Sequence, residues 1–118
     1  MKDAPNIRTA IPRHRVQIGE FQLTILGDIE SNDPLPYRWI AAFVQSGESK
    51  PQLYVCSEKA RRAEADRGAW RLRVVDPTIS DVLDVGDQWG DLENFTAEAI
   101  RVGQKLLKLS DETPWVLS

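Results

Sequence analysis

The longest amphipathic segment of the chain is formed by residues 92–109. When this segment is wound as a helix at about 100° per residue, its apolar residues fill about 180° of the circumference, whereas a surface helix usually carries a stripe of roughly 100° or a little more. We therefore expect a helix that packs deeply against the part of the chain that precedes it. The apolar half contains Leu92, Phe95, Thr96, Ala99, Ile100, Val102, Gly103, Leu106, Leu107 and Leu109.

The ends and the middle of this segment support the helix. Asp91 is a favourable N-cap residue, and Glu93 places a negative charge in the first turn. Lys105 and Lys108 lie in the last turn, where the helix dipole favours positive charge. Gly103 lies at the centre of the apolar half, although glycine inside a helix costs about 1 kcal/mol relative to alanine. This position predicts a close approach, in which a Trp or Phe of the sheet presses against bare backbone.

The region before the helix shows strand patterns of period two. Apolar residues alternate with polar ones on both sides of Gly19 and Glu20, which predicts either a tight hairpin or one long strand with a bulge at the glycine. Two further strands are expected at residues 52–57 and 70–75, the second with one apolar and one basic face. The alternating apolar residues around the glycine are Val16, Ile18, Phe21, Leu23 and Ile25.

Residues 37–44 carry the most apolar strand pattern. Both faces of this strand are largely apolar, which is typical of a central strand covered on two sides. Its odd positions are Tyr37, Trp39, Ala41 and Phe43, and its even positions are Arg38, Ile40, Ala42 and Val44.

Residues 77–86 fit either a short helix or a strand. Asp76 and Pro77 can open a helix as its N-cap and first residue, and Ile79 and Val82 have helical spacing. The β-branched residues of the segment also suit a strand. We expect the short helix.

Together these elements predict one α+β domain. Strands come first and the helix last, and short connections make successive strands neighbours. We therefore expect an antiparallel meander sheet of four to five strands, with the long C-terminal helix packed on one face. Residues 1–12 are polar and have no period, so they are expected to form a loose N-terminal arm before the domain at residues 13–118.

A sheet of this size is wider than one helix. Four or five strands at a spacing of about 4.8 Å give a width of roughly 20 Å, whereas a helix is only about 10–12 Å across. Because residues 37–44 are apolar on both faces, the second face must be covered by the segment after Pro77, by the N-terminal arm, by a second copy of the chain or by a ligand. We expect self-association or a protein partner. The candidate partner-binding residues are Tyr37, Trp39, Phe43 and Trp70.

Composition and charge narrow the possible functions only a little. The chain has 118 residues, a net charge of −3 and one cysteine, so it forms no internal disulfide, and a reducing, cytoplasmic location is expected. No apolar run reaches the roughly 20 residues that a membrane span requires, and no apolar signal segment is seen, so no membrane association is expected. Residues 1–75 carry a net charge of +3 and residues 76–118 a net charge of −6. We interpret them as a basic layer and an acidic layer that attract each other within one domain.

Recognisable catalytic and cofactor motifs are absent. The only histidine, His14, could reach Cys56 only if two distant strands paired, and there is neither a nucleophile elbow nor a phosphate-binding loop. One cysteine and one histidine cannot build a structural zinc site, and the acidic residues at 76–93 lack the spacing of a calcium loop. We therefore expect no metal and no cofactor.

Four arginine residues suggest a second possible function, the binding of nucleic acid or another anion. Arg61 and Arg62 lie in one loop, and Arg71 and Arg73 project from the same face of the strand at 70–75. A sheet that presents arginines can bind nucleic acid or another anion. The sequence favours a small, non-enzymatic, protein-binding or self-associating module. Nucleic-acid or anion binding through these arginines is the second hypothesis, and an enzyme without a recognisable motif is the third.

Overall fold

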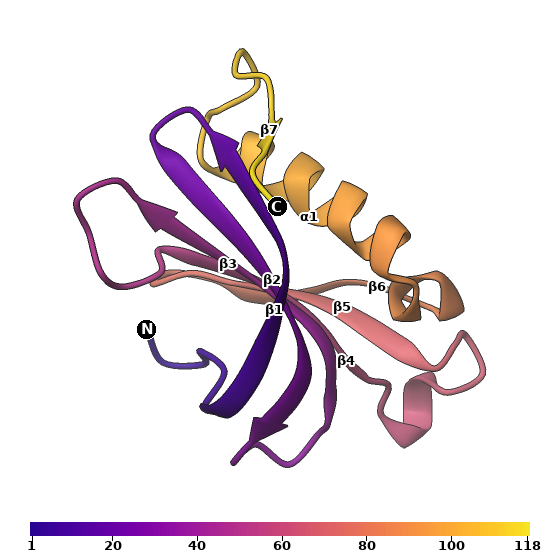
Figure 1. Cartoon of the computed structure of the whole chain (residues 1–118). Coiled ribbons are helices and arrows are strands. Elements are labelled where there is room, and N and C mark those ends of the chain that lie inside the picture. Colours follow the sequence, from indigo (N-terminus) through magenta and orange to yellow (C-terminus); the bar gives the residue numbers. More distant parts are fainter.

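One seven-stranded antiparallel sheet and one α-helix make up the fold (Figure 1). The computed structural model describes residues 1–118, and the strand order in the sheet is β6-β5-β4-β3-β2-β1-β7. The predicted α+β class and meander are confirmed, but the sheet has seven strands rather than four to five. The strands are β1 (Ile7–Ile18), β2 (Phe21–Ser31), β3 (Tyr37–Gln45), β4 (Leu53–Lys59), β5 (Trp70–Val75), β6 (Ser80–Gly86) and β7 (Trp115–Val116). A 3₁₀ turn, η1 (Arg62–Glu64), lies between β4 and β5, and a second, η2 (Asp87–Gly90), lies between β6 and the α-helix.

The two strands that the sequence did not predict lie at the edges of the sheet. The short helix expected at residues 77–86 is wrong, since β6 occupies this segment and pairs with β5. The Asp76 carboxylate does accept the backbone N–H groups of Thr78 and Ile79, both at 2.7 Å, but it closes a hairpin turn instead of starting a helix. The other edge strand, β7, pairs with β1 near Val16.

The N-terminal segment is more ordered than the sequence pattern indicates. β1 begins at Ile7, so the second half of the expected loose arm at residues 1–12 is strand, because this stretch pairs with the end of β2. Before it, Pro5 is buried and the Asn6 N–H donates to Asp33. At the far end of β1, Gly19 has φ +55° and closes a two-residue turn, which confirms the hairpin alternative.

The helix α1 (Leu92–Leu106) has 15 residues and is shorter than predicted. Its N-cap is confirmed, because the Asp91 carboxylate accepts the Asn94 N–H at 2.9 Å. The helix stops early because Lys108 takes a left-handed conformation, with φ +58°, and the Leu109 N–H returns to the carbonyl of Gln104. No helix of the protein combines the length and apolar character needed to cross a membrane.

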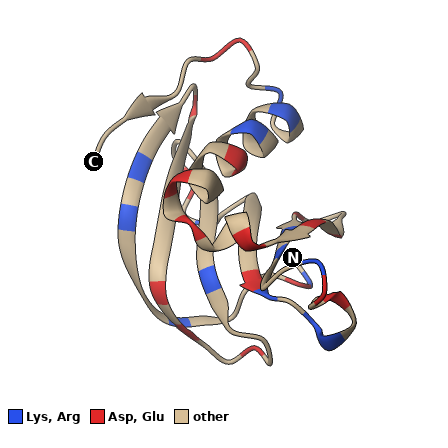
Figure 2. Cartoon of the chain, turned by 90° about the vertical axis from the view of Figure 1, so that its right-hand side faces the viewer, with Lys and Arg blue, Asp and Glu red and all other residues tan.

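The main core lies between α1 and one face of the sheet. Figure 1 and Figure 2 show the helix lying against one face of the twisted sheet, and its residues Phe95, Ala99, Val102 and Gly103 are buried there. A Cβ atom at Gly103 would overlap the ring of Phe43. The predicted contact between an aromatic residue of the sheet and bare helix backbone is thus confirmed.

A β-bulge in β3 changes which residues share a face. Tyr37 pairs with Glu58 and Trp39 with Ser57, so two steps along β3 match one step along β4. Arg38 is the extra residue, and Tyr37 therefore lies on the face opposite Trp39. The expectation that all odd positions of this strand share one face is wrong at Tyr37.

Part of the second face of the sheet is covered by the chain itself. Ile40 and Cys56 are fully buried there beside Tyr37. Ile7 and Ile29, from the outer ends of β1 and β2, pack against this cluster. The outer ends of β1 and β2 therefore cover the apolar cluster around Ile40, whereas Ala42 and Val44, farther along the same face, are partly exposed.

Candidate anion-binding cavity

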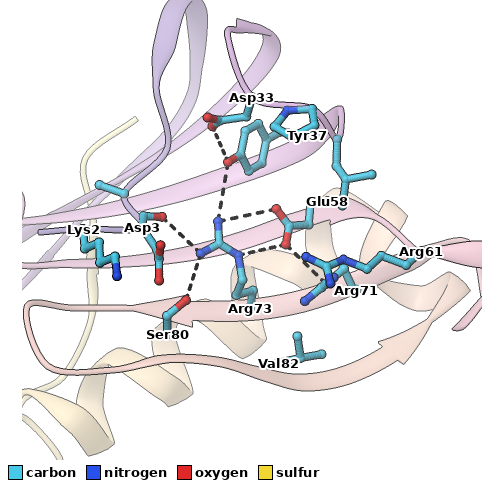
Figure 3. A pocket seen from close by; sticks show the side chains of 13 residues that line it. Lys2, Asp3, Asp33, Tyr37, Glu58, Arg61, Arg71, Arg73, Ser80 and Val82 are labelled. Atoms are coloured by element: carbon cyan, nitrogen blue, oxygen red, sulfur yellow. Dashed lines mark hydrogen bonds and ion pairs between the residues drawn. The ribbon is translucent and has the colours of Figure 1, made fainter. Parts of the chain in front are cut away.

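A polar cavity of about 450 Å³ opens on the sheet face opposite α1 (Figure 3). It is lined by residues of the N-terminal segment, of the loop before β3, and of β4, β5 and β6. Four cationic and three anionic side chains line it. These are Lys2, Arg61, Arg71 and Arg73, and Asp3, Asp33 and Glu58.

The register between β4 and β5 builds the floor of this cavity. Glu58 lies opposite Arg71, and Cys56 lies opposite Arg73. Since side chains alternate along a strand, Leu72 points into the core under α1 while its two arginine neighbours point the other way. The bulge in β3 adds Tyr37 to the same surface.

Arg73 is the centre of the hydrogen-bond network in Figure 3. Its Nε donates to Oε1 of Glu58 at 2.8 Å, and its Nη1 donates to the carbonyl of Asp3 at 3.1 Å and to Oγ of Ser80 at 3.3 Å. Its Nη2 lies 3.5 Å from both the Tyr37 hydroxyl and Oε2 of Glu58. Every nitrogen of this guanidinium is thus paired within the protein, so Arg73 fixes the floor of the cavity.

Tyr37 and Asp33 form one wall of the cavity. The Tyr37 hydroxyl donates to Oδ2 of Asp33 at 2.6 Å, and the same oxygen accepts the Asn6 N–H at 2.9 Å. Burial, and then the hydrogen bond to Asp33, raise the pKa of Tyr37 above its ordinary value. The phenol therefore remains neutral at physiological pH and serves as a fixed hydrogen-bond donor.

Arg71 differs from Arg73 because its guanidinium is not satisfied. The residue is only 6% exposed, yet neither Nε nor Nη1 makes a hydrogen bond. Oε1 of Glu58 lies 3.3 Å from Nε, and Oε1 of Glu64 lies 3.6 Å from Nη1, so both carboxylates attract the cation without accepting an N–H. Buried donors without acceptors are costly, particularly on a charged group. Both nitrogens are enclosed by the protein, whereas Nη2 makes no hydrogen bond and is not enclosed, so Nη2 is the atom of Arg71 that an acceptor from outside the chain can reach.

The structure brings together only some of the arginines that the sequence selected. Arg61, Arg71 and Arg73 line the cavity, whereas Arg62 lies outside it and is exposed on η1. The surrounding loop carries both signs of charge (Figure 2). The four residues therefore do not form one exposed basic surface.

The predicted partner-binding residues are also separated. Trp39 and Phe43 are 4% and 0% exposed in the core under α1, and the Trp39 indole donates to the carbonyl of Gly90 at 3.0 Å. Trp70 is half-buried against the same core. Only Tyr37 reaches the cavity, so the four residues do not form a common exposed surface.

Comparison with protein-family models, curated proteins and solved structures finds no match to this chain. The function must therefore be argued from the cavity itself. No group of three His, Cys, Asp or Glu side chains lies close enough together to hold a metal ion.

Covalent chemistry between Cys56 and His14 is excluded by the fold. His14 lies on β1 and Cys56 on β4, and two strands stand between them, which places them about 14 Å apart at ordinary strand spacing. Cys56 is fully buried, and this burial raises the pKa of its thiol. Nε2 of His14 instead lies 3.6 Å from Oε1 of Glu93 on α1.

Several cavity residues were not selected from the sequence, above all Glu58. A signal for it exists, because Glu58 shares a face with Cys56 on a strand that can lie opposite Arg71 and Arg73. An acidic residue that follows an apolar strand pattern, opposite two arginines, indicates a paired and buried carboxylate. The contributions of Lys2, Asp33 and Ser80 depend on tertiary contacts and leave no such pattern.

Proposed function

We propose that this protein is a non-enzymatic binding protein that holds an anionic group in the cavity, against Arg71. The observation that supports this function is the Arg71 guanidinium, which lines the cavity, is almost fully buried and makes no hydrogen bond within the protein. An anion in the cavity would accept from Nη2, the nitrogen that is not enclosed, and hydrogen bonds between charged groups are among the stronger ones in proteins.

Two features favour a single anionic group over the backbone of a nucleic acid. Arg71 is buried at the floor of the cavity and only 11% of the Arg73 side chain is accessible. The exposed arginines of the adjoining loop, Arg61 and Arg62, are interspersed with Glu64 and Asp66. Glu58 lies between Arg71 and Arg73 and neutralises part of their charge. Nucleic-acid binding usually requires several exposed basic contacts along the phosphate backbone.

The same geometry also weighs against self-association through β3. The other apolar residues of this strand are buried and only Ala42 and Val44 are partly exposed, so β3 offers little apolar surface to a partner.

Isothermal titration calorimetry with benzoate, a small carboxylate, tests the proposal at low ionic strength. We expect saturable binding to the wild type, and a loss of about ten-fold or more in affinity for Arg71→Met, which removes the charge-assisted hydrogen bonds. Arg62→Met is the matched control, because it removes one arginine nearby but outside the cavity. Absence of binding to the wild type, or equal losses in the two variants, would contradict the proposal.

A further inference from the structure

The charges at the floor of the cavity indicate which anion the site accepts. Glu58 lies 3.3 Å from Nε of Arg71 and 2.8 Å from Nε of Arg73, so one carboxylate is shared by two guanidinium groups. Glu64, which lies 3.6 Å from Nη1 of Arg71, brings these four groups to a net charge of zero. The charged side chains that line the cavity, four cationic and three anionic, carry a net charge of +1, which one singly charged anion would neutralise.

From this balance, and resting on the proposed function, we infer that the ligand group is a carboxylate with a single negative charge, and not a doubly charged phosphate. Glu64 already lies 3.6 Å from Nη1 of Arg71, and Asp3 and Asp33 line the same cavity. Each of these carboxylates repels a second negative charge on the ligand, and unfavourable placement of like charges costs several kcal/mol in binding sites.

The remaining walls indicate the body of the ligand. Pro34, Leu35 and Val82 line the cavity beside the charged floor, and Val82 is 39% exposed. The volume of about 450 Å³ lies within the range of small-molecule sites, roughly 300–1,000 Å³. These features fit a small free carboxylate with an apolar body.

Two probes that differ only in the anionic group test this selectivity. Benzoate and phenyl phosphate share one ring, and at pH 7.5 the phosphate is mostly doubly charged because its second pKa is near 6. We expect calorimetry to show that benzoate binds at least about ten-fold more tightly than phenyl phosphate, since like charges in the cavity oppose the dianion. Equal or tighter binding of phenyl phosphate would overturn the inference while leaving an anion site in place, whereas a failure of both probes would overturn the proposed function itself.

A polypeptide is the other source of a carboxylate. A hexapeptide with a C-terminal phenylalanine presents the same group on a longer chain. We expect it to bind at least about ten-fold more weakly than benzoate, because a cavity of this volume accommodates a small ligand. Tighter binding of the peptide would overturn the assignment to a small free ligand.

A change of one cavity charge tests the electrostatic reason directly. Glu64→Gln removes the carboxylate beside Arg71 from a position that is partly exposed, with 17% of the side chain accessible, and is therefore safer for folding than Glu58. We expect the preference for benzoate over phenyl phosphate to fall by about three-fold or more in this variant. Glu98→Gln makes the same change in net charge on α1, away from the cavity, and is expected to leave the preference unchanged. An unchanged preference in Glu64→Gln would contradict the charge-balance argument.

Discussion

The ring of Phe43 lies against the backbone of Gly103, at the point where α1 crosses the sheet. Both residues are buried, and no side chain larger than hydrogen fits at position 103 without moving the ring. The glycine weakens the helix by about 1 kcal/mol relative to alanine. Because glycine has no side chain, the helix approaches the sheet closely at this point, and Phe95, Ala99 and Val102 are buried.

Substitution of this glycine tests how tightly the helix packs. We expect Gly103→Ala to lower the free energy of unfolding by about 1–2 kcal/mol, because overpacking a core typically costs 1–3 kcal/mol and outweighs the gain in helix propensity. Urea unfolding followed by circular dichroism measures the change. If the ring causes this loss, Gly103→Ala should lower the free energy of unfolding less in a Phe43→Leu background than in the wild type. A stabilised single variant would contradict the close contact.

A buried hydroxyl joins β4 to the turn that precedes the helix. Ser57 donates through Oγ to the carbonyl of Trp89 at 2.6 Å, and both residues are buried. Ser57→Ala leaves this carbonyl without its partner, so we expect a loss of about 1–3 kcal/mol in the free energy of unfolding. Ser49→Ala changes an exposed serine and serves as the control, with an expected change near zero. Equal unfolding midpoints for the two variants would show that the bond contributes little.

The two tyrosines predict how stability depends on alkaline pH. Burial raises the pKa of both Tyr37 and Tyr54 above their ordinary value near 10, so the folded protein holds these protons more tightly than the unfolded chain does. Their contribution to stability is therefore complete below about pH 10 and is lost as the pH rises above that value. Tyr37→Phe should make this loss shallower.

Absorbance at 295 nm measures the ionisation of these phenols. We expect less tyrosinate signal near pH 10 from the native protein than from the unfolded chain, and a further rise that accompanies cooperative unfolding at higher pH. The unfolded chain in urea should titrate near 10, as free tyrosine does. If the native protein also shows a full titration near 10, the assigned environments of Tyr37 and Tyr54 are wrong.

Glu58 and Glu98 provide a comparison between a buried and an exposed ion pair. Glu58 has 7% of its side chain accessible and lies between two arginines. Glu58→Gln leaves buried positive charge uncompensated, so it should lower the free energy of unfolding by about 3–5 kcal/mol. Glu98→Gln breaks an ion pair with Arg101, whose side chain is 61% exposed, and should lower the free energy of unfolding by about 1 kcal/mol or less. Thermal unfolding of the two variants makes the comparison, and similar losses would argue against a buried network.

Much of the fold follows from local patterns in the sequence. The alternation around Gly19, the apolar stripe of the helix and the N-cap at Asp91 all have short-range causes, and each is found in the structure. The placement of Arg71 and Arg73 on one face of β5 follows from period two in the same way. The end of the helix was missed because Lys108 takes a left-handed conformation that glycine usually provides.

The cavity depends on relationships that no local pattern encodes. The bulge at Arg38 moves Tyr37 to the opposite face, and its cause lies in the pairing of β3 with β4. The charged floor exists only because the register places Glu58 opposite Arg71. The cover over Ile40 and Cys56 depends on Ile7 and Ile29, at the outer ends of β1 and β2, which approach this cluster only once the sheet has formed.

The central claim concerns the guanidinium of Arg71, and nuclear magnetic resonance of the arginine Nε–H groups tests it most directly. Titration with benzoate should shift the Arg71 Nε–H resonance in a saturable manner, because a carboxylate that accepts from Nη2 changes the charge distribution of the whole guanidinium. The resonance of Arg62, outside the cavity, should remain in place. An Arg71 resonance that does not move, or that moves no more than that of Arg62, would contradict the account.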